Sequence, residues 1–314
     1  ATFNMKGGTI GGATVDAANT ATYKGGGVYV KNGGTFTMNK TASVTGNTAK
    51  QGNGGGVYVD SGKFNMNGSA SIKSNKTVNN DAYGGGVYVI GEKSTFEMNG
   101  TASITDNTAP NGGGGVYVNS GKFNMNGNAS IKSNTASGVF VSSNATFTVS
   151  GAPTVMGNTR QGAASNVFLA GSKTITIGGT LDAGARIGVT KTVYSLIADN
   201  VSEDYSGIFF SDNTQYKVEY DKTDETNHKL VLTNSSAVTH THSWSYETKD
   251  NDRSTIYVSC TGEGDCAYRN TPATVTISTD QTVYDCAQIM AAPTAQLTYS
   301  NNWPEGPDGV KKAE

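Results

Sequence analysis

The sequence predicts an all-β fold built on a right-handed parallel β-helix of about seven coils. The first observation is a fixed period: the motif GGGVYV begins at residues 25, 54, 84 and 113, so that successive copies are 29, 30 and 29 residues apart. The second is that each repeat holds three short segments in which apolar and polar residues alternate, as they do in strands. The third is that the turns between these segments are too short for the crossover of a βαβ unit. A period of this length is typical of a solenoid.

Three kinds of strand recur in each coil. The first is Val-Tyr-Val, the second is Phe-x-Met, and the third is Ala-Ser-Ile or Ala-Ser-Val. In a parallel solenoid each strand pairs with its equivalent one coil away, about 4.8 Å along the axis, so identical residues stack. The alternation directs Val, Phe, Met and Ala inward and directs Tyr29, Thr37 and Ser43 outward. Strand twist and the chirality of parallel connections favour right-handed winding.

An asparagine follows the third strand of each coil by three residues. The set comprises Asn47, Asn75, Asn107, Asn134 and Asn158. Stacked amides can form hydrogen bonds from one coil to the next, as they do in fibrils. We interpret these asparagines as a structural ladder and not as ligands of a bound group.

The outward position of the first strand carries an aromatic side chain in six successive coils. These residues are Tyr29, Tyr58, Tyr88, Tyr117, Phe140 and Phe168. Aromatic rings spaced by one coil are suited to stacking on sugar rings or on a partner chain. The alternative is that Tyr suits a strand and shields the backbone ladder. The row is therefore a hypothetical surface binding ladder with a structural explanation beside it.

The repeat fades near Val189, and three regions are expected. Residues 1–190 form the parallel β-helix, residues 191–236 form a β-rich cap with a linker, and residues 237–314 form a small β-sandwich. A cap is required because the last coil of a solenoid exposes a sheet edge and an apolar floor. Strand-like segments of the final module are Trp244–Tyr246, Ile256–Cys260, Ala273–Ser278 and Gln296–Tyr299. The chain ends soon after the last of them, so the module is expected to be incomplete.

Charge is divided unequally along the chain. Residues 1–190 carry 14 Lys and Arg and 7 Asp and Glu, a net charge of +7, whereas residues 191–314 carry 9 and 18, a net charge of −9. Two modules of different origin would explain the division. The other interpretation is that the basic half contacts an anionic partner, such as a cell-wall polymer or the acidic half of another copy.

The three cysteines lie near the end of the chain. Cys260 and Cys266 are separated by a glycine-containing loop, and in an oxidising compartment this spacing predicts a local disulfide. Cys286 is then left over, and its role, buried thiol or link between chains, stays open. His240 and His242 share one face of a strand, but no third ligand with a recognisable spacing accompanies them, so no metal site is predicted.

No catalytic site is predicted. The acidic residues occupy different phases of the repeat, so none of the outward rows collects two or three of them on adjacent coils; they are Asp16, Asp60, Asp81, Glu92, Glu97, Asp106 and Asp182. No cofactor is expected, because phosphate-cradling loops lead into helices and the sequence contains no convincing helix. Scattered lysines and a slightly negative total charge argue against nucleic acid. No apolar run has the length of a membrane span.

The alternation of GGGVYV, TFTMN and ASVTGNTA resembles the right-handed β-helix repeats of large surface proteins of Gram-positive gut bacteria, which are mostly classed as adhesins. Asn166–Leu169 followed by Lys173–Gly179 is similar to the way in which those helices end. The tail, from His242 through the two cysteines to Ile277, resembles an Ig-like module repeated in the same proteins. Cys286 stands where that module usually has Gly, and the family's sortase anchor is absent from these residues.

The resemblance implies a non-catalytic extracellular protein, on a bacterial cell surface or secreted, that displays its β-helix to a glycan or protein ligand of unknown identity. The alternative is a structural subunit that associates end to end in a head-to-tail filament, because the first coil begins at residue 1 without a cap of its own. A polysaccharide-active enzyme is a third and weaker interpretation, since it would rest on fold analogy alone.

Overall fold

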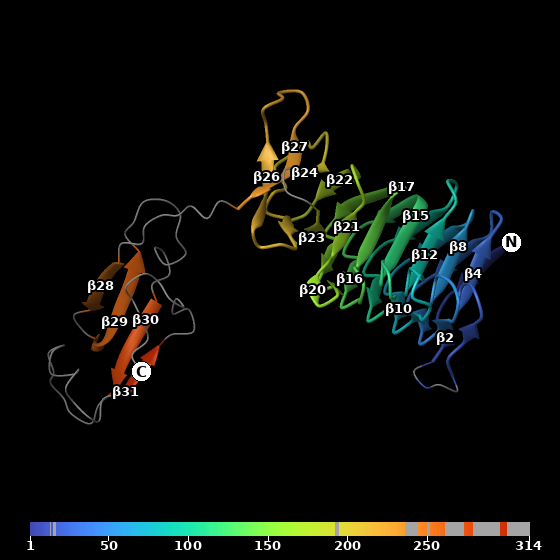
Figure 1. Ribbon diagram of the computed structural model, residues 1–314, viewed down its shortest axis with the longest axis horizontal. Coiled ribbons are helices and arrows are strands. Elements are labelled where there is room, and N and C mark those ends of the chain that lie inside the picture. Colours follow the sequence, from blue (N-terminus) through green and yellow to red (C-terminus); the bar gives the residue numbers. More distant parts are fainter. Residues whose placement is uncertain are drawn as a thin grey trace. The chain divides into compact units, whose positions relative to one another are not determined.

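The computed structural model describes residues 1–12, 14, 17–191 and 195–235, and the strands 244–249, 252–260, 273–278 and 296–299. The chain divides into two units, Ala1–Ser235 and Ser236–Glu314. All helical or strand structure in the described residues is β-strand, without a helix, as the sequence predicts. Figure 1 shows the first unit as a stack of coils with the N-terminus at one end and β24, β26 and β27 at the other.

The first unit is a parallel β-solenoid of about six turns, fewer than the seven coils that the sequence predicts. The first wall contains β4 (Val28–Lys31), β8 (Val57–Asp60), β12 (Val87–Ile90), the start of β15 (Val116–Met125), the start of β17 (Val139–Gly151) and β21 (Val167–Leu169). The count falls because β23 (Arg186–Thr190) pairs with strands of both the third and the first wall, so the last coil is not a full one.

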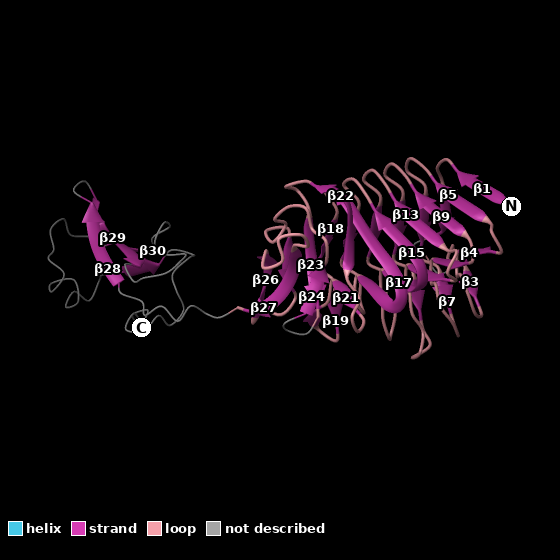
Figure 2. Ribbon diagram, turned by 90° about the horizontal axis from the view of Figure 1, so that it is seen from above, coloured by secondary structure: helices cyan, strands magenta, loops and turns pink. Residues whose placement is uncertain are grey.

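The other two walls are also parallel. The second wall contains β1 (Thr2–Met5), β5 (Thr35–Met38), β9 (Lys63–Met66), β13 (Thr95–Met98), the ends of β15 and β17, and β22 (Ile175–Leu181). The third wall contains β2 (Thr9–Gly11), β6 (Ser43–Thr45), β10 (Ser71–Lys73), β14 (Ser103–Thr105), β16 (Ser130–Lys132) and β18 (Thr154–Met156). Figure 2 shows the strands of the second wall side by side.

Short pairings complete the turn between the third and first walls. They are the parallel set β3 (Thr20–Ala21), β7 (Thr48–Ala49) and β11 (Lys76–Thr77), and the antiparallel hairpin of β19 (Thr159–Arg160) and β20 (Ala163–Ala164).

Identical residues pair with identical residues, which builds the core as stacked columns. Phe36 pairs with Phe64, and Met38 pairs with Met66. In the second wall the phenylalanine rings from Phe36 to Phe147 are fully buried, whereas that of Phe3 in the first strand is 52% exposed. Neighbouring ring centroids lie 4.7 to 5.2 Å apart from Phe36 to Phe147. Burial of one large ring per coil adds substantially to the apolar area that a chain so poor in hydrophobic residues can bury.

The three glycines of GGGVYV are required for different reasons, which the third copy of the motif illustrates. Gly84 has a φ of +65°, which favours glycine, and a Cβ there would lie 2.6 Å from the carbonyl oxygen of Val87. A Cβ at Gly85 would lie 2.4 Å from the carbonyl oxygen of Thr108, and one at Gly86 would lie 2.6 Å from that of Gly115. The first glycine therefore makes the bend, and the other two let the next coil approach.

An antiparallel sheet follows the last coil. It consists of β24 (Ser195–Ala198), β27 (Lys229–Asn234) and β26 (Tyr216–Asp221), in that order, while β25 (Phe209–Ser211) returns to pair in parallel with β23. The side chains of Ile197, Leu230 and Leu232 are fully buried and belong to the same hydrophobic cluster as the solenoid core. This segment lies in the region for which the sequence predicts a cap.

The described strands of the second unit form one antiparallel sheet of β28 (Trp244–Lys249), β29 (Asp252–Cys260), β30 (Ala273–Ser278) and β31 (Gln296–Tyr299). The four predicted strand segments lie within them. Cys260 ends β29, but Cys266, Cys286, His240 and His242 lie outside the described residues. The disulfide and the Ig-like sandwich therefore stay predictions.

Replacing Val87 by Asp tests the inward assignment of the first wall. Val87 is fully buried between Val57 and Val116, so an aspartate would place an unpaired charge in the core and lower the free energy of unfolding by roughly 3 to 5 kcal/mol. Chemical denaturation measures the loss. The control is Ser103→Asp, at a half-buried outward position of the same coil; equal losses for both variants would contradict the assignment.

Candidate functional site

The aromatic row lies outside the core cluster, but it is not the open ladder that the sequence suggests. Tyr58, Tyr88 and Tyr117 are only 3%, 6% and 8% exposed and form a hydrophobic cluster of their own. Their rings stack, with centroids 5.0 Å apart between Tyr58 and Tyr88 and 5.3 Å apart between Tyr88 and Tyr117. Of the two interpretations of the row, the surface binding ladder is therefore wrong for these three tyrosines, and their burial favours the structural one.

Loops between the third and first walls cover the row. The ring of Tyr83 packs on that of Tyr117 at a centroid distance of 4.4 Å, and Asn111 Nδ2 donates a hydrogen bond to the Tyr83 hydroxyl. The ammonium group of Lys24 lies 5.0 Å from the centroid of the Tyr58 ring. Burial raises the pKa of Tyr58 to about 12 and also raises the pKa of Tyr88. The middle of the row is thus a second small core.

The ends of the row are more accessible. Tyr29 is 43% exposed and meets Tyr58 edge to face, while Phe140 and Phe168 are half-buried at the other end. The guanidinium of Arg160 lies 5.5 Å from the centroid of the Phe168 ring. Single rings at either end could contact a ligand, but they do not form a platform of adjacent coils.

The predicted asparagine ladder is present and is almost completely buried. In each rung, one Asn Oδ1 accepts hydrogen bonds from both the backbone N–H and the side-chain Nδ2 of the Asn in the preceding coil. For example, Asn107 Oδ1 lies 2.9 Å from Asn75 N and 3.0 Å from Asn75 Nδ2. The same pattern joins Asn47, Asn75, Asn107, Asn134 and Asn158. These amides are engaged with one another, which leaves no role for them as ligands of a bound group.

The ladder extends beyond the predicted set at both ends. Asn19 donates to Asn47 Oδ1 at the exposed start, and Asn158 donates to Asn166 Oδ1 at the other end. Asn19 precedes the first full repeat, and Asn166 follows Asn158 by only eight residues. A search limited to the regular period misses both residues.

A second amide ladder, which the sequence analysis missed, lies in the turn between the second and third walls. Its members are half-buried and are Asn39, Asn67, Asn99 and Asn126. Here each Nδ2 donates to the Oδ1 of the preceding coil, so this ladder runs in the direction opposite to that of the first. The signal was available, because an Asn directly follows Phe-x-Met in four consecutive coils.

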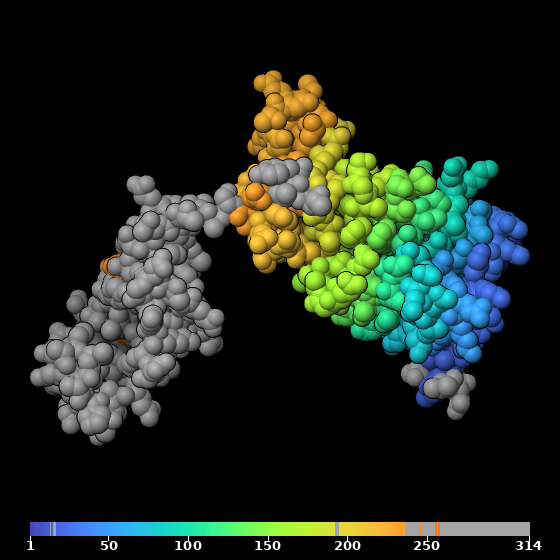
Figure 3. All heavy atoms as spheres, in the orientation of Figure 1, coloured from blue at the N-terminus to red at the C-terminus, as the bar shows by residue number. Residues whose placement is uncertain are grey.

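Two walls present outward rows of short polar side chains that pair in register from coil to coil. The row of the second wall is Thr37, Asn65, Glu97, Asn124, Thr148 and Thr176. The row of the third wall is Thr9, Ser43, Ser71, Ser103, Ser130 and Thr154. Most of these side chains are half-buried, and neighbouring members can bond to each other, as Asn65 Nδ2 does to Thr37 Oγ1 and Ser71 Oγ to Ser43 Oγ. Figure 3 shows the coils of the first unit as successive bands in contact with one another.

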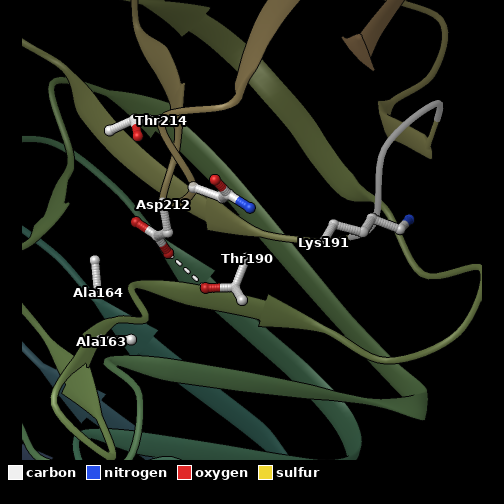
Figure 4. A pocket seen from close by; sticks show the side chains of 7 residues that line it. Ala163, Ala164, Thr190, Lys191, Asp212 and Thr214 are labelled. Atoms are coloured by element: carbon white, nitrogen blue, oxygen red, sulfur yellow. Dashed lines mark hydrogen bonds between the residues drawn. The ribbon is translucent and has the colours of Figure 1, made fainter. Parts of the chain in front are cut away.

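A pocket of about 430 Å³ lies where the solenoid meets the antiparallel sheet. Its lining residues are Ala163, Ala164, Thr190, Lys191, Asp212, Asn213 and Thr214. Figure 4 shows Asp212 facing Thr190, whose hydroxyl donates a hydrogen bond to Asp212 Oδ2, while the Lys191 amine points away. That amine donates to the carbonyl oxygens of Lys173 and Leu196, and burial lowers its pKa. The charged groups of the pocket are therefore held by other parts of the chain.

Chemistry-bearing groups are dispersed in the part of the chain that the structure describes. Within it no group of three or more His, Cys, Asp or Glu side chains could hold a metal ion. Nor does it contain a helix with the length and hydropathy of a membrane-spanning segment. Asp60, one of these dispersed acidic residues, accepts hydrogen bonds from Tyr29 and Ser61.

Comparisons of this chain with protein-family models, with curated proteins and with solved structures find no match.

Replacing Asn107 by Ala tests the buried ladder. The change removes the acceptor of the Asn75 backbone and side-chain N–H groups, and it removes the donor that serves Ile72 O, Thr105 O and Asn134 Oδ1. Each buried polar group left without a partner costs about 1 to 3 kcal/mol, so we expect a loss of about 3 kcal/mol or more in unfolding free energy. The control is Asn124→Ala on the outward row. A similar small effect for both would argue against the ladder.

Replacing Tyr88 by Ser tests whether the aromatic row is structural. Because Tyr88 is buried and stacked on both sides, loss of the ring should cost about 3 kcal/mol in chemical denaturation. Tyr88→Phe keeps the ring and should stay within about 1 kcal/mol of the unmodified protein. A neutral Tyr88→Ser variant would show that the loops do not cover the row in solution.

Proposed function

We propose that this chain is a non-catalytic extracellular surface protein, whose solenoid displays its polar faces to a glycan or protein ligand in adhesion. The observation that carries the proposal is the pair of in-register polar rows on the second and third walls. Solenoids offer extended surfaces of this kind for binding. A ligand lying along the axis would meet one equivalent polar side chain per coil, about every 4.8 Å.

The structure moves the proposed contact surface away from the aromatic row. The middle of the row is covered by loops and the asparagine ladder is internal, so neither offers a ligand a surface that spans adjacent coils. Individual hydrogen bonds at a surface contribute little, but contacts repeated along several coils add through multivalency. The proposal keeps the right-handed winding, the local disulfide, the Ig-like second module and the bacterial cell-surface location as expectations from the sequence and its resemblance.

The head-to-tail filament is a weaker alternative. Direct stacking of one copy's first coil on another copy's last coil would need an open apolar end. At the C-terminal end of the solenoid, the side chains of Leu230 and Leu232 already occupy that place. A filament would therefore require a different contact.

The proposal is tested on an array that carries neutral glycans, acidic glycans and extracellular matrix proteins. Two paired variants place long charged side chains on one wall each, at positions separated by one coil: Asn65→Arg with Asn124→Arg on the second, and Ser71→Arg with Ser130→Arg on the third. We expect one pair to reduce retention of the bound ligand at least about tenfold without changing the melting temperature, because surface substitutions rarely affect folding.

The matched control is Ser202→Arg with Gln215→Arg, two exposed positions outside both walls, which should bind as the unmodified protein does. Retention of no array component, or retention that neither wall variant reduces, would contradict the proposed function.

A further inference from the structure

The buried asparagine ladder has a direction. From Asn19 to Asn166, every side-chain Nδ2 donates to the Oδ1 of the next coil, so all the amide dipoles point the same way. Such a chain ends with an amide whose donors need an acceptor beyond the last asparagine. Asn166 is that amide, since both its backbone N–H and its Nδ2 point toward the end of the solenoid.

A carboxylate supplies the missing acceptors. Asn166 N lies 2.7 Å from Asp212 Oδ2, and Asn166 Nδ2 lies 2.5 Å from Asp212 Oδ1. Thr190 Oγ1 donates a third hydrogen bond to Asp212 Oδ2 at 2.5 Å. An ionised carboxylate only accepts hydrogen bonds, and it has no amide donor of its own that would require another rung.

A glycine makes room for this contact. Val167 pairs with Val189, so Gly188 occupies the coil position that follows Asn166. A Cβ at Gly188 would lie 2.3 Å from Asn166 Nδ2 and 2.6 Å from Asp212 Oδ1. The chain thus omits the side chain in one coil, and the carboxylate of the following segment fills the place of the next rung.

We infer that Asp212 terminates the asparagine ladder. Its carboxylate accepts the last hydrogen bonds of the ladder, ends the solenoid and couples the terminal antiparallel sheet to the stacked coils. Asp212 follows β25 directly and lies in the turn that leads to β26, so this contact joins the last parallel strand to the sheet that covers the core. The negative charge faces the donor end of the aligned amides, which favours it for the same reason that anions are favoured at helix N-termini.

The test is an exchange of the two groups, followed by thermal unfolding of the full chain. Asn166→Asp alone sets two carboxylates against each other and should lower the melting temperature by about 5 °C or more. Adding Asp212→Asn restores one carboxylate and one amide, because the amide introduced at position 212 can donate to the carboxylate at position 166 and accept from the backbone N–H there. The double variant should therefore melt well above Asn166→Asp.

Gly188→Ala gives an independent measurement, with Gly207→Ala as its matched control, since a Cβ at Gly207 meets nothing within 4 Å. We expect Gly188→Ala to lower the melting temperature and to speed hydrogen exchange at the Asn166 amide, and Gly207→Ala to do neither. The inference would be overturned if the double variant lost as much melting temperature as Asn166→Asp and Asp212→Asn together. It would also be overturned if the two glycine variants behaved alike.

Discussion

The coil-to-coil amide contact is the constraint on which the rest of the first unit depends. A buried asparagine is costly unless its donors and acceptors are all engaged. In this chain Asn107 Oδ1 accepts from two nitrogens of Asn75, and Asn107 donates in turn to Asn134. These bonds form only when each Asn lies directly over the next, so the ladder penalises a slip in register that stacked walls of similar strands would otherwise tolerate.

The walls and the ladders stabilise the solenoid in different ways. Columns of Val, Phe and Met remove apolar area from water, and the glycines of GGGVYV let successive coils approach closely. The two amide ladders then fix the turns on either side of the third wall, and they run in opposite directions. The inward and turn positions of each coil are therefore committed to structure.

The period of the sequence was sufficient to predict the parallel walls, the inward Phe36 and Met38, and the asparagine ladder, because each depends only on what recurs in every coil. The burial of Tyr88 could not be predicted in this way. It depends on loops whose length and sequence differ between coils, such as the one that carries Tyr83. The contact between Asp212 and Asn166 was also out of reach, since it joins residues 46 apart beyond the regular repeat.

The most direct test of this account is native-state hydrogen exchange at the backbone amides of Asn47, Asn75, Asn107, Asn134 and Asn158. Each lies in a turn, where an amide normally exchanges quickly, yet each donates to the Oδ1 of the next ladder residue. We predict that all five exchange as slowly as the amides of the fully buried Val87 and Val116. Exchange at the rate of exposed turn amides would contradict the claim that the ladder holds the coils together.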